Sequence, residues 1–174
     1  MRASRLGTRR PRSTREGGFF LIEALIAILI FSLGILGLVA MGGAAIAAQS
    51  DAQYRTEAAA LADEIASKIS LNVDRYNAAN AYASTAASIA ATLGPFVHQP
   101  NGTNCAFSGP ASTDPVVQAW VTKISSQGGL PGATATSQQI TIDTANFNRI
   151  SVTICWQAPS DKAVRQHTLI TYVN

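Results

Sequence analysis

The sequence has few of the side chains on which catalytic and metal sites depend. Its 174 residues include only two histidines, His98 and His167, and two cysteines, Cys105 and Cys155. It contains no phosphate-binding glycine loop, HExxH pair, CxxC pair or nucleophile motif. Each isolated histidine is better explained as a surface or hydrogen-bonded residue than as a ligand or a base. We therefore predict no catalytic residue, no metal site and no cofactor.

Charge is also scarce over a long part of the chain. Across residues 19–48, a stretch of 30 residues, the only charged side chain is Glu23. A helix of this length rises about 1.5 Å per residue and is long enough to cross a hydrocarbon core of roughly 30 Å. The sequence therefore predicts one membrane-spanning helix near the N-terminus.

The basic residues are concentrated before that stretch. The N-terminal segment holds six arginines, namely Arg2, Arg5, Arg9, Arg10, Arg12 and Arg15. Only Glu16 opposes them, whereas the rest of the chain has seven basic and nine acidic groups. The overall net charge of +3 therefore gives no reason to predict nucleic-acid binding. The positive-inside rule places the N-terminus in the cytoplasm and everything after Ser50 on the far side of the membrane.

The order of small and apolar residues at the start of this helix is informative. An ordinary signal peptide places its small residues after the apolar core, whereas here Gly17 and Gly18 precede it. The run Gly18-Phe19-Phe20-Leu21-Ile22-Glu23 behind a basic leader resembles the junction of type IV prepilins. The resemblance implies that prepilin peptidase cuts between Gly18 and Phe19 and that the new amine of Phe19 is methylated.

Glu23 is expected to need a partner. A carboxylate at the centre of a membrane helix costs about 2.5 to 3.5 kcal/mol, and less near the interface. The resemblance implies that Glu23 pairs with the terminal amine of Phe19 on a neighbouring subunit and so sets the stagger of subunits in a filament. The alternative is an interfacial glutamate that reaches the headgroups in an ordinary signal anchor.

The middle of the apolar segment narrows the resemblance. The stretch Ile30-Phe31-Ser32-Leu33-Gly34-Ile35-Leu36-Gly37-Leu38-Val39-Ala40 is similar to the one in PilV, the type IV pilus modification protein family of minor pilins. Glycines at 34, 37, 42 and 43 would permit close helix packing, although membrane helices also tolerate glycine generally. The mid-helix proline of many major pilins would fall near Ala40 and is absent.

This resemblance implies a set of partners and a location. The partners are prepilin peptidase, other major and minor pilins bound through the N-terminal helix, and the pilus assembly machinery of the inner membrane. The precursor would be a single-pass inner-membrane protein that later enters a pilus at the cell surface. Two alternatives stay open: a minor pseudopilin of a type II secretion system, and a signal-anchored exported binding domain.

The exported part is predicted to have an α+β, pilin-like fold. We divide the chain into a leader (1–18), a transmembrane assembly helix (19–50), an amphipathic helical region (51–92) and a loop-rich head (93–174). The apolar residues Leu61, Ile65, Ile69 and Val73 recur at four-residue steps. Residues 116–124 suggest a short helix, and alternation predicts antiparallel strands at 138–142, 150–157 and 169–173. The long helix should pack on the Ile150, Val152, Ile154 and Trp156 face of this sheet.

The two cysteines both lie in the exported head. An oxidising compartment would allow Cys105 and Cys155 to form a disulfide, and a pair of reduced, buried thiols is the alternative. Because Cys155 alternates with Ile154 and Trp156 along its strand, the bridge should lie on the face of the sheet away from the helix.

Overall fold

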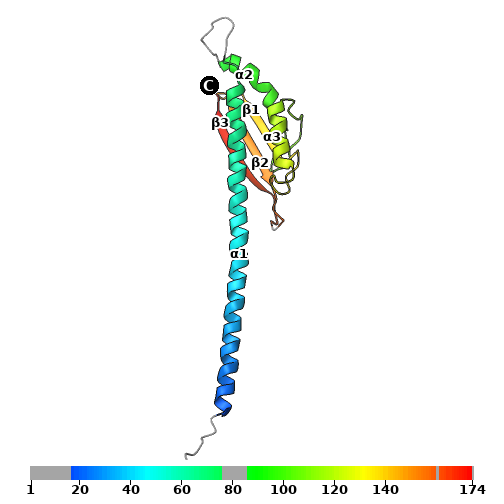
Figure 1. The fold of residues 1–174 in the computed structure, drawn as a ribbon. Coiled ribbons are helices and arrows are strands. Elements are labelled where there is room, and N and C mark those ends of the chain that lie inside the picture. The colour runs from blue at the N-terminus through cyan, green and yellow to red at the C-terminus, as the bar shows by residue number, and fades with distance from the viewer. Residues whose placement is uncertain (1–16, 76–85, 160, 174) are drawn as a thin grey trace, which may run out of the picture. The chain divides into compact units, whose positions relative to one another are not determined.

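The computed structural model describes residues 17–75, 86–159 and 161–173. Its elements are α1 (Gly17–Asn72), α2 (Ala86–Leu93), the 3₁₀ turn η1 (Gly94–Phe96), α3 (Pro115–Ser125), β1 (Gln138–Asp143), β2 (Arg149–Trp156) and β3 (Arg165–Tyr172) (Figure 1). The chain divides into two compact units between Ile46 and Ala47. The predicted α+β fold is confirmed, with a long N-terminal helix packed against a small antiparallel sheet. Residues 1–16, most of the predicted leader (1–18), lie outside the described residues.

Helix α1 changes character along its length. It contains no proline, and the part of α1 that belongs to the first unit is made almost entirely of apolar and small residues. In the second unit the helix is amphipathic, and Leu61, Ile65 and Ile69 are buried at four-residue spacing. Near its end the backbone N–H of Val73 donates to the Ile69 carbonyl at 3.1 Å, and the Arg75 guanidinium donates to the Ser70 carbonyl at 2.8 Å. These bonds satisfy two of the carbonyl groups that a helix end leaves without a partner.

The three strands form one antiparallel sheet in the order β1-β2-β3. In the register, Ile140 lies opposite Val152, and Ile154 lies opposite His167. Because strand side chains alternate between faces, Ile150, Val152, Ile154 and Trp156 share one face, as the sequence predicts. All four are buried.

The core lies between this sheet face and the part of α1 that belongs to the second unit. The predicted helix stripe of Leu61, Ile65, Ile69 and Val73 belongs to the same buried cluster as the apolar face of β2. Figure 1 shows the sheet lying against this part of α1, with α3 beside it. Since full burial of one such side chain contributes about 1.5 to 3 kcal/mol, this contact is the main source of stability of the head.

Helix α3 closes one side of the core, and its start is fixed by local chemistry. Asp114 is the N-cap, and its Oδ1 accepts hydrogen bonds from the backbone N–H groups of Val116 at 2.8 Å and Val117 at 3.3 Å. Pro115 occupies the first helical position, where a missing N–H costs nothing. The capped helix presents Val117, Trp120 and Ile124 to the core.

Two details differ from the sequence expectation. Strand β3 begins at Arg165, before the predicted start at Leu169, because an edge strand can be polar on both faces. The predicted helical region 51–92 is divided, since α1 ends at Asn72 and α2 begins at Ala86. In the connector between η1 and α3, residues 97–114, an isolated bridge joins Asn101 and Ser108. Gly102, with φ +89°, forms the turn beneath this bridge, and a Cβ there would clash with the Ala106 carbonyl.

Candidate functional site

The first candidate site is the apolar start of α1, where the sequence places the processing and assembly residues. Gly18 lies within the first turn of the helix, and Phe19 follows it with 86% of its surface exposed. Glu23 is also exposed and forms no ion pair or hydrogen bond with another described residue. Large apolar side chains on every side of this segment are exposed, which marks a surface made for lipid or for other helices.

Within the described part of the chain, one helix is long and apolar enough to cross a membrane, and it is α1. Its mean hydropathy reaches 2.8 over the most apolar window, none of which is buried within the described chain. The glycines of this segment are not required by contacts within the chain, because a Cβ added at Gly34, Gly37, Gly42 or Gly43 meets nothing within 4 Å. The segment can therefore anchor the protein in a membrane.

The disulfide predicted between Cys105 and Cys155 is present, with 5.8 Å between the two Cα atoms. It joins the connector after η1 to β2. Cys155 is buried and lies on the face of β2 opposite Ile154 and Trp156, as the alternation predicts. Asn104 and Cys105 both have positive φ values, +53° and +66°, so the bridge holds a tight backbone turn.

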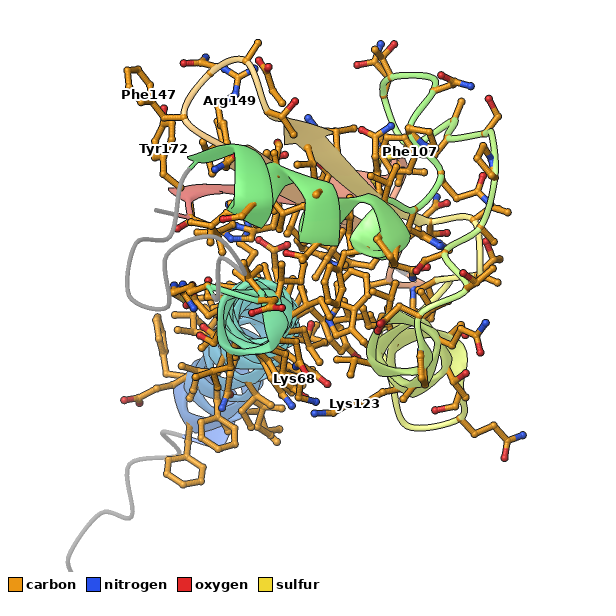
Figure 2. All side chains as sticks on the ribbon, turned by 90° about the horizontal axis from the view of Figure 1, so that it is seen from above. Lys68, Phe107, Lys123, Phe147, Arg149 and Tyr172 are labelled. Carbon is orange, nitrogen blue, oxygen red and sulfur yellow. A yellow bond between two sulfur atoms is a disulfide. The ribbon has the colours of Figure 1, made fainter. Side chains whose placement is uncertain are left out.

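Two contacts join α1 to α3 in the head, and neither of them follows from the sequence. The indole Nε1 of Trp120 donates to the Leu61 carbonyl at 2.8 Å in the buried interior. Glu64 accepts from Lys123 and from Lys68, each at 2.7 Å. Figure 2 shows both lysines extending to the same side of the molecule. The hydrogen bonds from Lys123 and then Lys68 lower the pKa of Glu64. Glu64 and Lys68 lie four residues apart on one helix, so their pairing follows from helical spacing, whereas Lys123 is distant along the chain.

His98 is a buried structural histidine in the segment between η1 and α3. Its Nδ1 accepts the backbone N–H of Ser112 at 3.1 Å, and its Nε2 lies 3.4 Å from the Ala135 carbonyl. The neutral imidazole with its proton on Nε2 satisfies both neighbours. Burial lowers the pKa of His98 from its ordinary 6.5, against a smaller raising effect of the Ala135 hydrogen bond. His98 therefore holds two loops together as a neutral ring.

This geometry predicts a pH dependence of stability. Above pH 6.5 His98 is neutral in both folded and unfolded chains, so its contribution is complete. Below that pH the unfolded chain takes up a proton that the folded one resists, so the free energy of unfolding falls with pH. In His98→Asn the side-chain oxygen can replace Nδ1 without titrating, and urea unfolding between pH 7 and 5 should show a smaller slope. Equal slopes in the His98→Asn and unsubstituted chains would contradict this account.

Gln138 is a further residue whose position the sequence did not reveal. It is completely buried, and neither atom of its amide has a hydrogen-bond partner among the described residues. It starts β1 on the inward face that it shares with Ile140. Among the described residues, no group of three or more histidine, cysteine or acidic side chains could hold a metal ion.

Comparisons of the chain with protein-family models, with curated proteins and with solved structures found no match. The assignment of function therefore rests on the residues and geometry described above.

Proposed function

We propose that this chain is a minor type IV pilin, made as an inner-membrane precursor and incorporated into a pilus or used to prime its assembly. The observation that carries the proposal is the run Gly18-Phe19-Phe20-Leu21-Ile22-Glu23 at the start of an exposed apolar helix. The same helix continues to Asn72 and packs on an antiparallel sheet. In a pilin, the first part of this helix mediates assembly and the rest carries the exported head.

The exposed position of Glu23 supports this proposal. A carboxylate with no partner within the described chain is costly in lipid, and a neighbouring subunit can supply the opposite charge. Cleavage after Gly18 would create that charge at Phe19, because a new terminal amine is protonated near neutral pH. The pair would form only between subunits that are correctly staggered.

The head is suited to an oxidising compartment beyond the membrane. Its disulfide ties the connector to β2, and its apolar core is closed by α1, α3 and the sheet. This stable head would be displayed on the outside of a filament, with prepilin peptidase, other pilins and the inner-membrane assembly machinery as the partners of α1. No enzymatic role is proposed.

Processing provides the direct test. Co-expression of the chain with a prepilin peptidase should give a mature protein that starts at N-methylated Phe19 and contains residues 19–174. Intact-mass analysis and sequencing of the N-terminal peptide would establish both changes. Gly18→Leu should stay uncleaved, because a large side chain replaces the small residue before the cut, whereas the neighbouring Gly17→Ala should still be processed. A chain that retains Met1, or one cut near Ala48, would overturn the proposal.

A further inference from the structure

The two edges of the sheet differ in how the rest of the chain covers them. The β1 edge is covered by the connector between η1 and α3, since His98 and Ile140 exchange backbone hydrogen bonds at 2.9 and 3.1 Å. The side-chain amide of Gln139 also donates to the Gln99 carbonyl at 3.0 Å. At the other edge, no described strand lies beyond β3 (Figure 1). This β3 edge is therefore open to a partner.

The backbone pairing shows which groups form the β3 edge. The N–H of Cys155 donates to the Ser137 carbonyl at 2.9 Å, on the β1 side of β2, and the N–H of Val173 donates to the Asn148 carbonyl at 3.3 Å. In an antiparallel pair, hydrogen-bonded residues alternate with residues whose N–H and C=O groups point away from the neighbouring strand. The residues of β3 that point away from β2 are Gln166, Thr168, Ile170 and Tyr172. Each of them presents one N–H and one C=O at the β3 edge.

Edge strands usually carry features that prevent pairing with other chains, and β3 has few of them. Across Arg165–Tyr172 there is no lysine, proline or glycine, and the register with β2 is continuous. Ile170 and Tyr172, two of the residues that form the β3 edge, are 54% and 51% exposed. A long, regular edge with exposed apolar side chains is a template for a further strand.

A groove of about 440 Å³ lies beside the β3 edge, between β3 and α1. The residues of α1 that line it are Asp63, Ala66, Ser67, Ser70 and Leu71. Three of these five side chains are small, and Leu71 is largely exposed. Because the side chains of a strand point alternately to its two faces, a strand paired with β3 would place every second side chain in this groove.

Asp63 is the charged residue among those that line the groove. Its side chain is exposed and forms no ion pair or hydrogen bond with another described residue. The next acidic residue of α1, Glu64, is by contrast paired with Lys68 and Lys123. An unpaired carboxylate beside a strand-shaped site favours a partner with a basic side chain at that point.

We propose that the β3 edge binds an extended strand of another protein, which pairs its backbone with β3 and places a lysine or arginine beside Asp63. Backbone hydrogen bonds would align the strand, and its apolar side chains would cover Ile170 and Leu71. A second copy of β3 is a poorer match, because its one arginine, Arg165, already pairs with Asp161. All these residues belong to the second unit, so the inference depends neither on membrane insertion of α1 nor on its processing.

Peptide selection on the full chain in detergent micelles tests this proposal. The probe is a library of random ten-residue peptides displayed on phage. Enriched peptides should lack proline, alternate apolar and polar residues, and carry a lysine or arginine. One selected peptide is then synthesised with blocked ends and methylated at the backbone nitrogens of alternate residues. Methylation of one alternate set should weaken binding by at least about tenfold and methylation of the other should not, because one edge of the peptide pairs with β3.

Variants of the chain separate backbone pairing from side-chain contact. Thr168→Pro removes an N–H at the β3 edge, where the sheet does not use it, and should weaken binding of the selected peptide by at least about tenfold. Thr168→Ala is the matched control. It loses the same hydroxyl, including its 3.1 Å hydrogen bond with Thr153, but keeps the N–H and should bind like the unsubstituted chain. The thermal transition of each variant shows whether the head is folded.

A charge exchange tests the groove without altering the backbone of β3, so it stands even if Thr168→Pro fails to fold. Asp63→Lys should bind the selected peptide more weakly and should prefer a version with glutamate in place of its basic residue. Glu57→Lys, on the same helix but outside the groove, should keep the original preference.

Several results would overturn the proposal. A library without enriched peptides, or normal peptide binding by folded Thr168→Pro, would exclude strand pairing at β3. Equal effects of the two methylated sets would indicate side-chain adhesion without backbone pairing. An unchanged preference in Asp63→Lys would remove the basic residue from the description of the partner. Dimers of the full chain that compete with the peptide would make a second copy the occupant.

Discussion

Replacing Glu23 with alanine is expected to reduce incorporation of the chain into filaments by at least about tenfold, while the head folds normally. A factor of ten corresponds to about 1.4 kcal/mol, which is less than the cost of leaving a carboxylate unpaired in lipid. Alanine at this position avoids the cost of an unpaired carboxylate in lipid. It also lacks the negative charge that would form an ion pair with the neighbouring amine. Quantitative immunoblotting of sheared filaments against whole-cell protein would measure the loss.

Two matched variants make this experiment specific. Glu23→Gln keeps the size and polarity of the side chain without its charge, and it should show the same loss. Glu16→Ala removes the other acidic residue of the N-terminal region, which belongs to the leader, and should leave incorporation unchanged. The thermal transition of the head should be the same in all three variants. Normal filament incorporation of Glu23→Ala would exclude the proposed charge pair, and a lower transition temperature would reveal a structural role instead.

The double substitution Cys105→Ala/Cys155→Ala is expected to lower the free energy of unfolding of the head by about 4 kcal/mol. The disulfide links residues separated by 50 positions, and closing such a loop removes much of the entropy of the unfolded chain. The backbone of Cys105, at φ +66°, also loses the bond that holds its turn. Urea unfolding of the full chain in detergent, followed by tryptophan fluorescence, would give the difference.

Reduction supplies the control for this effect. A reductant should destabilise the unsubstituted chain to the same extent as the double substitution, and it should leave the double variant unchanged. Alanine is preferred to serine because Cys155 is buried and a serine hydroxyl there would introduce its own cost. A loss of less than about 1 kcal/mol would show that the loop is held in place mainly by other contacts, such as the bridge between Asn101 and Ser108.

The parts of the fold that follow from periodicity could be predicted from the sequence. The stripe from Leu61 to Val73 and the alternation from Ile150 to Trp156 each define an apolar face, and two such faces in one domain must meet. The disulfide was predicted because the chain has only two cysteines and both lie in the part expected to be exported. The start of β3 could not be predicted, because residues 165–168 are polar on both faces of the strand and give no alternation of apolar and polar residues.

Contacts between distant residues were beyond sequence reasoning for a physical reason. The Glu64–Lys123 pair and the Trp120–Leu61 hydrogen bond each join positions that only the packing of α3 on α1 brings together. The burial of His98 and Gln138 likewise depends on which loops cover them, and polar residues carry no periodic signature of burial. At the start of α1, by contrast, the proposed role of Glu23 comes from its position in a sequence motif and not from a contact in the structure.

The disulfide also limits how far the chain can extend when it is placed under tension. Suppose that tension peels the second unit of α1 away from the sheet. Without the bridge, the whole segment from Val73 to Cys155 on β2 could unravel, about 82 residues or roughly 280 Å. With Cys105 bonded to Cys155, the load reaches β2 after about 32 residues, or roughly 110 Å. The disulfide thus acts as a short covalent tether, which keeps the detached sheet close to α1 and should speed the return of the native contact between them.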